Sequence, residues 1–124
     1  MKNIFLEPTN STPAVVFNID GRLLLQGRSL PEDVHHFYKP LIDWVSKIKS
    51  PVVRIDINLE YLNSASSKKL FELLKTLDSN TGVKELIVNW HYVCDDEDAL
   101  ESGQIIEEFM QKAEFRYHEY SDAA

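Results

Sequence analysis

Three serine side chains, Ser64, Ser66 and Ser67, stand close together in the middle of the chain. The pattern on either side predicts that a β-strand ends before them and that a helix begins there or shortly after. A hydroxyl at a helix N-terminus can accept a hydrogen bond from an unpaired backbone N–H group and so cap the helix. It can also accept a phosphoryl group, because those N–H groups and the helix dipole stabilise a phosphate. The spacing leaves both interpretations open, with Asn63 or Ser64 as the cap and Lys68 close to the phosphate.

The surroundings of these serines do not favour catalysis. A serine nucleophile needs a general base, and the histidine candidates, His91 and His118, belong to other predicted strands. The serines lack the flanking glycines of a nucleophile elbow, and the chain has no glycine-rich phosphate loop. We therefore expect a protein without catalytic residues and without a cofactor.

A second group of potentially reactive side chains combines His91 and Cys94 with the acidic residues 95–98. Histidine, cysteine and carboxylates are all metal ligands, but a zinc site needs further nitrogen or sulfur ligands, and only lone histidines occur elsewhere. The acidic run also lacks the glycine and the twelve-residue frame of a calcium-binding EF-hand. We interpret it as a helix start, where the dipole favours negative charge, and expect no metal. A small metal-dependent enzyme that uses His91 and Cys94 is the alternative.

The elements that would position the serines are clear from hydrophobic periodicity. Residues 52–62 alternate strictly, with Val53, Ile55 and Ile57 on one side and polar residues on the other, which predicts a half-buried strand. Residues 64–69 interrupt the pattern and predict a serine-rich turn. Apolar residues then recur at helical spacing from Leu70 to Leu77, and Gly82 is expected to end this helix in the left-handed conformation.

Further strands and helices are expected on both sides of this unit. Residues 14–18 and 22–26 should form a hairpin through Asp20 and Gly21, with residues 2–7 as an edge strand. Ser29 should cap a first helix, which Pro40 should kink or split. A strand over Glu85–Val93, a third helix after residue 98 and a short strand over residues 115–120 complete the predicted order.

This order predicts an α/β fold: a single STAS-like domain over residues 1–124, built as a sandwich. An antiparallel hairpin that leads into strand–helix–strand crossovers gives a mixed sheet. The polar side of the strand over residues 52–62 predicts that the helices cover mainly one face.

Composition narrows the possible partners and the compartment. The chain of 124 residues carries 20 acidic and 13 basic residues, a formal charge of -7, which argues against nucleic acid and anionic membranes as partners. The lone Cys94 excludes an internal disulfide and fits a reducing compartment. Because no stretch has the length of a signal peptide core or a membrane span, we expect a cytoplasmic protein.

Five segments in order resemble the SiaC family of bacterial regulatory phosphoproteins. They are TNSTP at 9–13, GRSLPE at 27–32, EYLNSASSK at 60–68, NWHY at 89–92, and the acidic residues 95–98 with ESG at 101–103. In the family pattern, which is similar to Tyr-Phe/Leu-Asn-Thr-Ser-Ser-(Ser)-Lys, the threonine is the phosphoacceptor. Ser64 stands at that position here, and Ala65 replaces a family serine.

The resemblance implies a non-enzymatic regulator that is switched by phosphorylation. It implies Ser64 as the phosphoacceptor, with Ser66 and Ser67 as alternatives, and Asn63, Ser64, Ser67 and Lys68 as partner-binding residues. The implied partners are a Ser/Thr protein kinase, a PP2C-type phosphatase and a diguanylate cyclase. In the family the unphosphorylated form activates the cyclase, which raises cyclic di-GMP and promotes biofilm formation. An anti-sigma factor antagonist in a partner-switching module is the alternative regulator.

Overall fold

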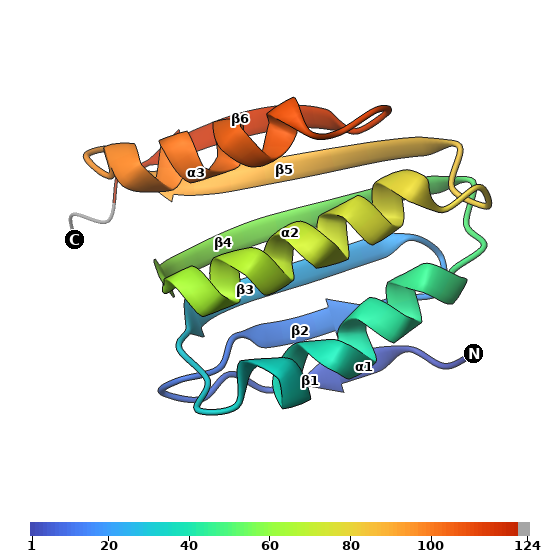
Figure 1. Cartoon of the computed structure of the whole chain (residues 1–124), viewed down its shortest axis with the longest axis horizontal. Helices are drawn as coiled ribbons and strands as arrows, with labels where there is room; N and C mark the ends of the chain where they lie inside the picture. The colour runs from blue at the N-terminus through green and yellow to red at the C-terminus, as the bar shows by residue number, and fades with distance from the viewer. Residues whose placement is uncertain (122–124) are drawn as a thin grey trace.

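A six-stranded sheet forms the centre of the molecule, and its strands follow one another in chain order (Figure 1). The computed structural model describes residues 1–121. The strands are β1 (Ile4–Leu6), β2 (Ala14–Phe17), β3 (Arg22–Ser29), β4 (Val52–Leu62), β5 (Glu85–Val93) and β6 (Glu114–Tyr120). The helices are α1 (Val34–Lys47), α2 (Ser64–Ser79) and α3 (Glu97–Glu108). β1, β2 and β3 pair antiparallel, whereas β3, β4, β5 and β6 pair parallel.

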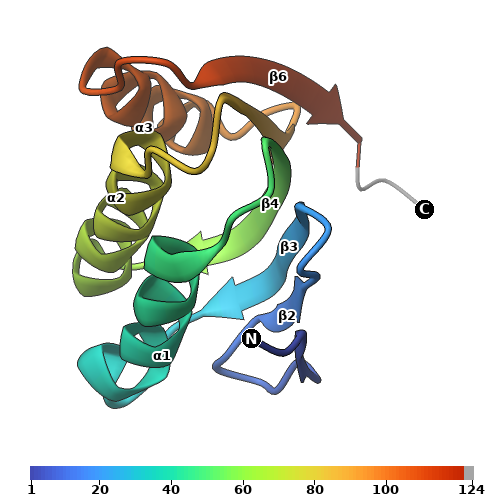
Figure 2. The same ribbon diagram turned by 90° about the vertical axis from the view of Figure 1, so that its right-hand side faces the viewer.

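The described helices all lie on one face of this curved sheet, and the other face is open (Figure 2). Each parallel pair is joined by a helical crossover, and such crossovers are right-handed. Because the crossovers step across the sheet in the same direction, they place their helices on the same side. The structure thus confirms the predicted mixed α/β fold with helices on one face.

The main core lies between the helices and the sheet. The alternating residues Val53, Ile55 and Ile57 of β4 are buried there, as predicted, and Trp90 of β5 lies beside them. Burying one such aliphatic side chain contributes about 1.5–3 kcal/mol, so this alternation fixes which side of β4 faces the helices. No helix of the described residues is long and apolar enough to span a membrane.

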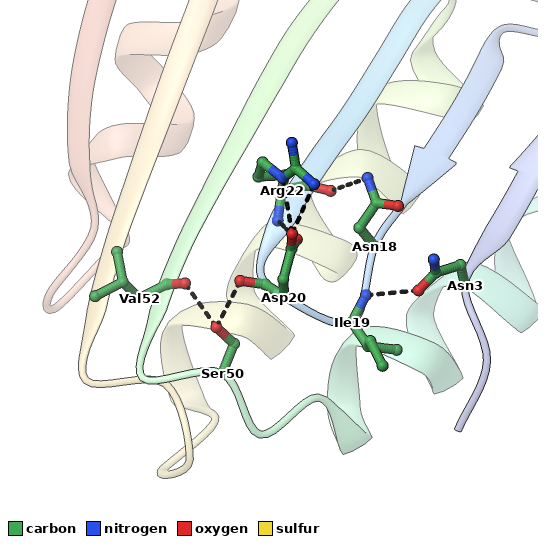
Figure 3. A network of polar contacts seen from close by, with 7 residues as sticks. All are labelled: Asn3, Asn18, Ile19, Asp20, Arg22, Ser50 and Val52. Carbon is green, nitrogen blue, oxygen red and sulfur yellow. Dashed lines mark hydrogen bonds and ion pairs between the residues drawn. The ribbon is translucent and has the colours of Figure 1, made fainter.

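The predicted hairpin between β2 and β3 is confirmed, and polar contacts attach it to β4 (Figure 3). Gly21 adopts a φ of +101°, and a Cβ atom there would lie 2.2 Å from the carbonyl oxygen of Val52, so only glycine fits. The single O–H of Ser50 is shared between the carbonyl oxygens of Asp20, at 3.0 Å, and Val52, at 2.8 Å. Arg22 pairs with Asp20 at 2.7 Å.

The first helix differs from the prediction at its start and in its middle. Asp33 is the N-cap of α1, and its carboxylate accepts a hydrogen bond from the backbone N–H of His36 at 2.9 Å. The predicted cap, Ser29, is instead the last residue of β3, where its hydroxyl is buried 2.6 Å from the Tyr38 hydroxyl. The predicted split at Pro40 is also wrong, because α1 continues through this residue. Pro40 is exposed, so water can satisfy the carbonyl group that the proline leaves unpaired.

The second helix differs from the prediction at both ends. It begins at Ser64 after the predicted cap candidate Asn63, so residues 64–69 form its first turns and the predicted serine-rich turn is wrong. At the other end, Gly82 is not left-handed, because the positive-φ glycines of the described chain are Gly21 and Gly27. Asn80 caps the helix in an extended conformation instead, and its side-chain amide donates to two carbonyl groups of the α1 C-terminus, at 3.0 and 2.9 Å.

One buried carboxylate joins the C-terminal end of α2 to the segment between α3 and β6. Asp78 accepts hydrogen bonds from the backbone N–H groups of Gln111, Lys112 and Ala113, at 2.7, 2.9 and 2.9 Å. Burial by itself raises the pKa of Asp78, but these three donors and the nearby Lys75 outweigh it and lower the pKa below the ordinary value. The carboxylate is therefore ionised in the folded protein at neutral pH.

Candidate functional site

The three serines lie on the first turn of α2, where they have different surroundings. Asn63 is the N-cap: its side-chain oxygen accepts a hydrogen bond from the Ser66 N–H at 2.8 Å, and its carbonyl accepts one from the Ser67 N–H at 2.9 Å. The cap is therefore Asn63 and not Ser64. This leaves the Ser64 side chain exposed at the first helical position.

The Ser66 hydroxyl is fully buried. It donates to the carbonyl oxygen of Ser29 at 3.0 Å, and its residue has 0 % exposure. The Ser29 hydroxyl contacts Tyr38 in turn, and burial raises the pKa of this tyrosine although its hydrogen bond with Ser29 acts in the opposite direction. A kinase needs an accessible hydroxyl, so this geometry disfavours Ser66 as a phosphoacceptor.

Ser67 and the lysines that follow it differ in accessibility too. Ser67 is half-buried in a groove between α2 and α3, which it lines together with Lys68. Lys69 pairs with Glu72 at 3.2 Å and contacts His35 at 3.2 Å, both on the side of α1. Lys68 is exposed and lies four residues after Ser64, so the two share a helix face. Lys68 is therefore the cation best placed to meet a phosphate on Ser64.

The surface next to Ser64 comes from the carboxyl ends of the parallel strands. A hollow of about 320 Å³ lies between the end of β4 and the start of α3, and its lining includes Tyr61, Asn63, Asp96 and Ser102. Tyr61 is exposed at 52 %, and the Arg28 guanidinium lies 4.5 Å from the centre of its ring. The four residues predicted to bind a partner, Asn63, Ser64, Ser67 and Lys68, thus sit together beside a concave and partly aromatic surface.

The second predicted group does not form one site. His91 forms a hydrogen bond with Asp56 of β4 at 2.9 Å and stacks on His118 of β6 at 4.8 Å. Asp96 caps α3 by accepting a hydrogen bond from the Ala99 N–H at 3.0 Å. This confirms the prediction that the acidic run lies at a helix start. Within residues 1–121 no three side chains of histidine, cysteine, aspartate or glutamate are placed to hold a metal ion.

Sequence reasoning missed the contact between Asp56 and His91. Both residues belong to the outward-facing set of adjacent parallel strands, so alternation could have placed them on one face. Their pairing also needs the strand order and register, which periodicity does not supply.

Comparison with known proteins agrees with this geometry. The model of the SiaC family of regulatory phosphoproteins matches residues 6–120. An uncharacterized protein of Pseudomonas aeruginosa strain UCBPP-PA14 is 31% identical over an alignment of 122 residues, and the match covers 94% of this chain and 94% of that protein.

Solved structures of SiaC are similar along nearly the whole chain. SiaC of Pseudomonas aeruginosa superposes with a TM-score of 0.84 at 27% identity and covers 97% of this chain and 100% of its own. The second similar structure is a chain in the crystal structure of the diguanylate cyclase SiaD in complex with its activator SiaC, from the same organism. It also superposes with a TM-score of 0.84, at 28% identity, and the match covers 94% of this chain and 99% of that chain. Sequence, fold and the serine-bearing helix start therefore lead to one conclusion: the chain belongs to the SiaC family of regulatory phosphoproteins.

Proposed function

We propose that this chain is a cytoplasmic, non-enzymatic regulator that binds and activates a diguanylate cyclase when Ser64 is unphosphorylated. A Ser/Thr protein kinase would phosphorylate Ser64, and a PP2C-type phosphatase would remove the phosphate. The proposal is supported by membership of the SiaC family and by the solved complex in which SiaC is the activator of the cyclase SiaD.

The observation that carries the choice of residue is the exposure of Ser64 at the first position of a helix that Asn63 already caps. Phosphorylation would therefore remove no capping hydrogen bond. The phosphate would lie at the positive end of the α2 dipole, with Lys68 one turn away. The modified protein should keep its fold while the surface of α2 changes its charge.

The size of this change in charge suits a switch. A phosphate adds about -1.5 to -2 charges at neutral pH. If the partner covers Ser64, the phosphate must lose its hydration. It must also lie against partner groups that fit a neutral hydroxyl in the unphosphorylated complex. A loss of about 3 kcal/mol weakens binding by about two orders of magnitude, which is enough to empty a micromolar interface.

The phosphoacceptor can be tested directly. The purified chain is incubated with ATP and each candidate kinase of its source organism, and the phosphopeptide is sequenced by mass spectrometry. We expect phosphate on Ser64, and its loss in Ser64→Ala but not in Ser67→Ala, the matched control on the same helical turn. Phosphate that persists unchanged in Ser64→Ala would assign the switch to another residue.

The regulatory role is tested separately with purified diguanylate cyclases from the same organism. We expect the unphosphorylated chain to bind one of them and to increase its rate of cyclic di-GMP synthesis, and the phosphorylated chain to do neither. Binding to an anti-sigma factor kinase, with no effect on any cyclase, would replace this proposal by the anti-sigma antagonist.

A further inference from the structure

Exposed apolar side chains gather at one edge of the sheet. Half of the large apolar side chains that are exposed in the described residues lie there, namely Met1, Phe5, Leu6 and Ile19. Phe5 is the most exposed of them, at 68 %. Apolar surface that is gathered in one place and not scattered marks a site for a partner.

This edge is the outer side of β1. One side of β1 pairs with β2, and no described strand pairs with its other side (Figure 1). Backbone N–H and C=O groups on that outer side can therefore form a ladder with a further strand. Ile4, Phe5 and Leu6 carry no charge that would oppose such pairing.

The opposite edge of the sheet is protected against such pairing. β6 forms that edge, and its exposed side chains include Glu114, Arg116, His118 and Glu119. Charged side chains on an edge strand discourage the addition of another strand. The two edges therefore differ, and β1 is the edge that is left open.

The backbone that leads into β1 is held in place (Figure 3). The side-chain oxygen of Asn3 accepts a hydrogen bond from the backbone N–H of Ile19 at 2.8 Å. The indole N–H of Trp44 donates to the carbonyl oxygen of Lys2 at 2.7 Å. A partner strand therefore meets an ordered edge, which limits the entropy that is lost on pairing.

We propose that β1 pairs with β1 of a second copy of this chain and joins the two sheets into one. A closed pair of identical chains has twofold symmetry, and a twofold axis perpendicular to the sheet makes the two strands antiparallel. With the axis midway between the two copies of Phe5, all three residues of each β1 are paired. Phe5 then lies opposite Phe5, and Ile4 lies opposite Leu6 of the other copy.

The apolar side chains of the two copies match on both faces of the joined sheet. On the open face, Phe5 lies in one row with Val16 and Leu24, its neighbours in the register of β2 and β3. Two such rows meet at the two Phe5 rings, and aromatic pairs that lie directly opposite stabilise antiparallel strands. On the helix side, Ile4 covers Leu6, which is exposed at 41 % in the single chain.

The charges next to β1 favour the antiparallel arrangement. Lys2 and Glu7 are exposed and flank the strand at opposite ends. In the antiparallel pair each Lys2 lies opposite Pro8 of the other copy, next to Glu7, so opposite charges approach one another. A parallel pair would instead place Lys2 beside Lys2 and Glu7 beside Glu7, which is destabilising. The edge is thus complementary to itself in one orientation.

The dimer leaves the Ser64 surface free. β2 and β3 separate β1 from β4 in the sheet, and Ser64 follows β4. The inference therefore goes beyond the proposed function and does not depend on it. A dimer of this kind carries two copies of the Ser64 surface.

The test is sedimentation equilibrium of the purified chain alone, from about 10 µM to about 1 mM, because a three-residue strand gives a weak dimer whose population follows concentration. About 0.15 M salt screens the repulsion between two chains of charge -7. We expect the average mass to rise towards that of a dimer.

Phe5→Lys should weaken dimerisation about tenfold or more, because two lysine side chains would lie directly opposite each other. Phe109→Lys is the matched control, because Phe109 has a similar exposure of 56 % but lies at the end of α3. This control should dimerise like the wild type. Thermal unfolding of both variants checks that the fold is kept.

A charge-reversed pair tests the register. Phe5→Glu alone should dimerise as poorly as Phe5→Lys. An equimolar mixture of the two variants should dimerise again, because a lysine then lies opposite a glutamate. In the wild-type chain, amide hydrogen exchange of residues 4–6 should slow as the concentration rises, whereas that of β6 should stay unchanged.

A wild-type chain that stays monomeric at every concentration would overturn the proposal and leave this edge to a strand of another protein. A dimer that Phe5→Lys leaves intact, a mixture that stays monomeric, or protection that appears in β6 would overturn it as well. Because these measurements use the chain alone, none of these results affects the proposed function. Failure of every cyclase to bind the chain would refute the proposed function and leave the dimer standing.

Discussion

Ser66 donates its buried hydroxyl to the carbonyl oxygen of Ser29 at 3.0 Å and thereby fastens the first turn of α2 to the end of β3. Ser64, two residues earlier, is exposed. One of two neighbouring serines therefore holds the helix start in place, and the other is left accessible for modification.

Replacing Ser66 by alanine should destabilise the protein by about 1–2 kcal/mol, because a buried hydrogen bond is lost at a fully enclosed position. Ser64→Ala is the matched control and should change the free energy of unfolding by less than about 0.5 kcal/mol. Urea unfolding followed by circular dichroism measures both. Equal midpoints for the two variants would contradict the structural role of Ser66.

The variant Ser64→Glu should keep or slightly raise the melting temperature, because a negative charge at a helix N-terminus contributes about 0.3–1 kcal/mol. It should also weaken binding to the cyclase. Ser79→Glu, at the exposed C-terminal end of the same helix, is the control. There the dipole opposes the charge, so stability should fall slightly while binding is retained. A variant Ser64→Glu that binds as tightly as the wild type would argue against a charge-based switch.

Asp78→Asn should cost about 2–3 kcal/mol, because the amide cannot accept all three backbone hydrogen bonds and loses the charge that strengthens them. The exposed Asp43, which pairs with Lys39 at 3.4 Å, is the control, and Asp43→Asn should cost less than about 0.5 kcal/mol. Chemical unfolding at neutral pH gives both values.

The contribution of Asp78 should also depend on pH in a defined direction. Its pKa is lowered in the folded state, so the carboxylate stabilises the fold above its unfolded pKa of about 3.9. That stability is lost as the pH falls through the folded pKa. The difference in melting temperature between wild type and Asp78→Asn should therefore be constant from pH 7 to about 5 and shrink below about 4. A difference that grows on acidification would be inconsistent with this carboxylate as the cause.

Gly103→Ala should destabilise the protein by about 1–2 kcal/mol although alanine favours helices, because the added methyl group would press on the Trp90 ring. The tryptophan emission should shift, since the indole N–H bonds to the Ala99 carbonyl in the same turn. Gln104→Ala, the exposed neighbour, serves as the control and should alter neither property. A stabilised Gly103→Ala variant would show that α3 moves away from the sheet without cost.

Periodicity was sufficient for the sheet and for the place of the serines. Strict alternation located β4, because half its side chains face a dry core, and the Asp20–Gly21 pair located the hairpin. The predicted start of α1 was wrong for a physical reason. Ser29 matched a capping pattern but is drawn into the core by Tyr38, nine residues away, which local patterns do not record.

At the start of α2 one of the two predicted caps, Asn63, is confirmed, but the turn predicted over residues 64–69 was wrong for the opposite reason. Serines have modest helix propensity and are common in turns, yet here Asn63 caps the helix and Ser66 finds a partner on β3, so the segment is helical. The resemblance favoured Ser64 among the three hydroxyls, and burial, which only the folded chain reveals, disfavours Ser66. The groove between α2 and α3 was likewise hidden, because Phe71 and Ile105 look like ordinary core residues of two amphipathic helices.

The order of the strands has a consequence for how the protein is made. Each strand pairs with the one synthesised immediately before it, so no described strand must wait for a later one to be inserted between two others. Contacts of this kind have a short sequence separation for a parallel sheet and favour rapid folding. The sheet can therefore grow from β1 towards β6 as the chain leaves the ribosome, and the edge at which the next strand adds is the edge most recently formed. The hydrogen bonds that fix the helix start next to Ser64 come from Asn63 and from Ser29 of β3, so they require neither β5 nor β6.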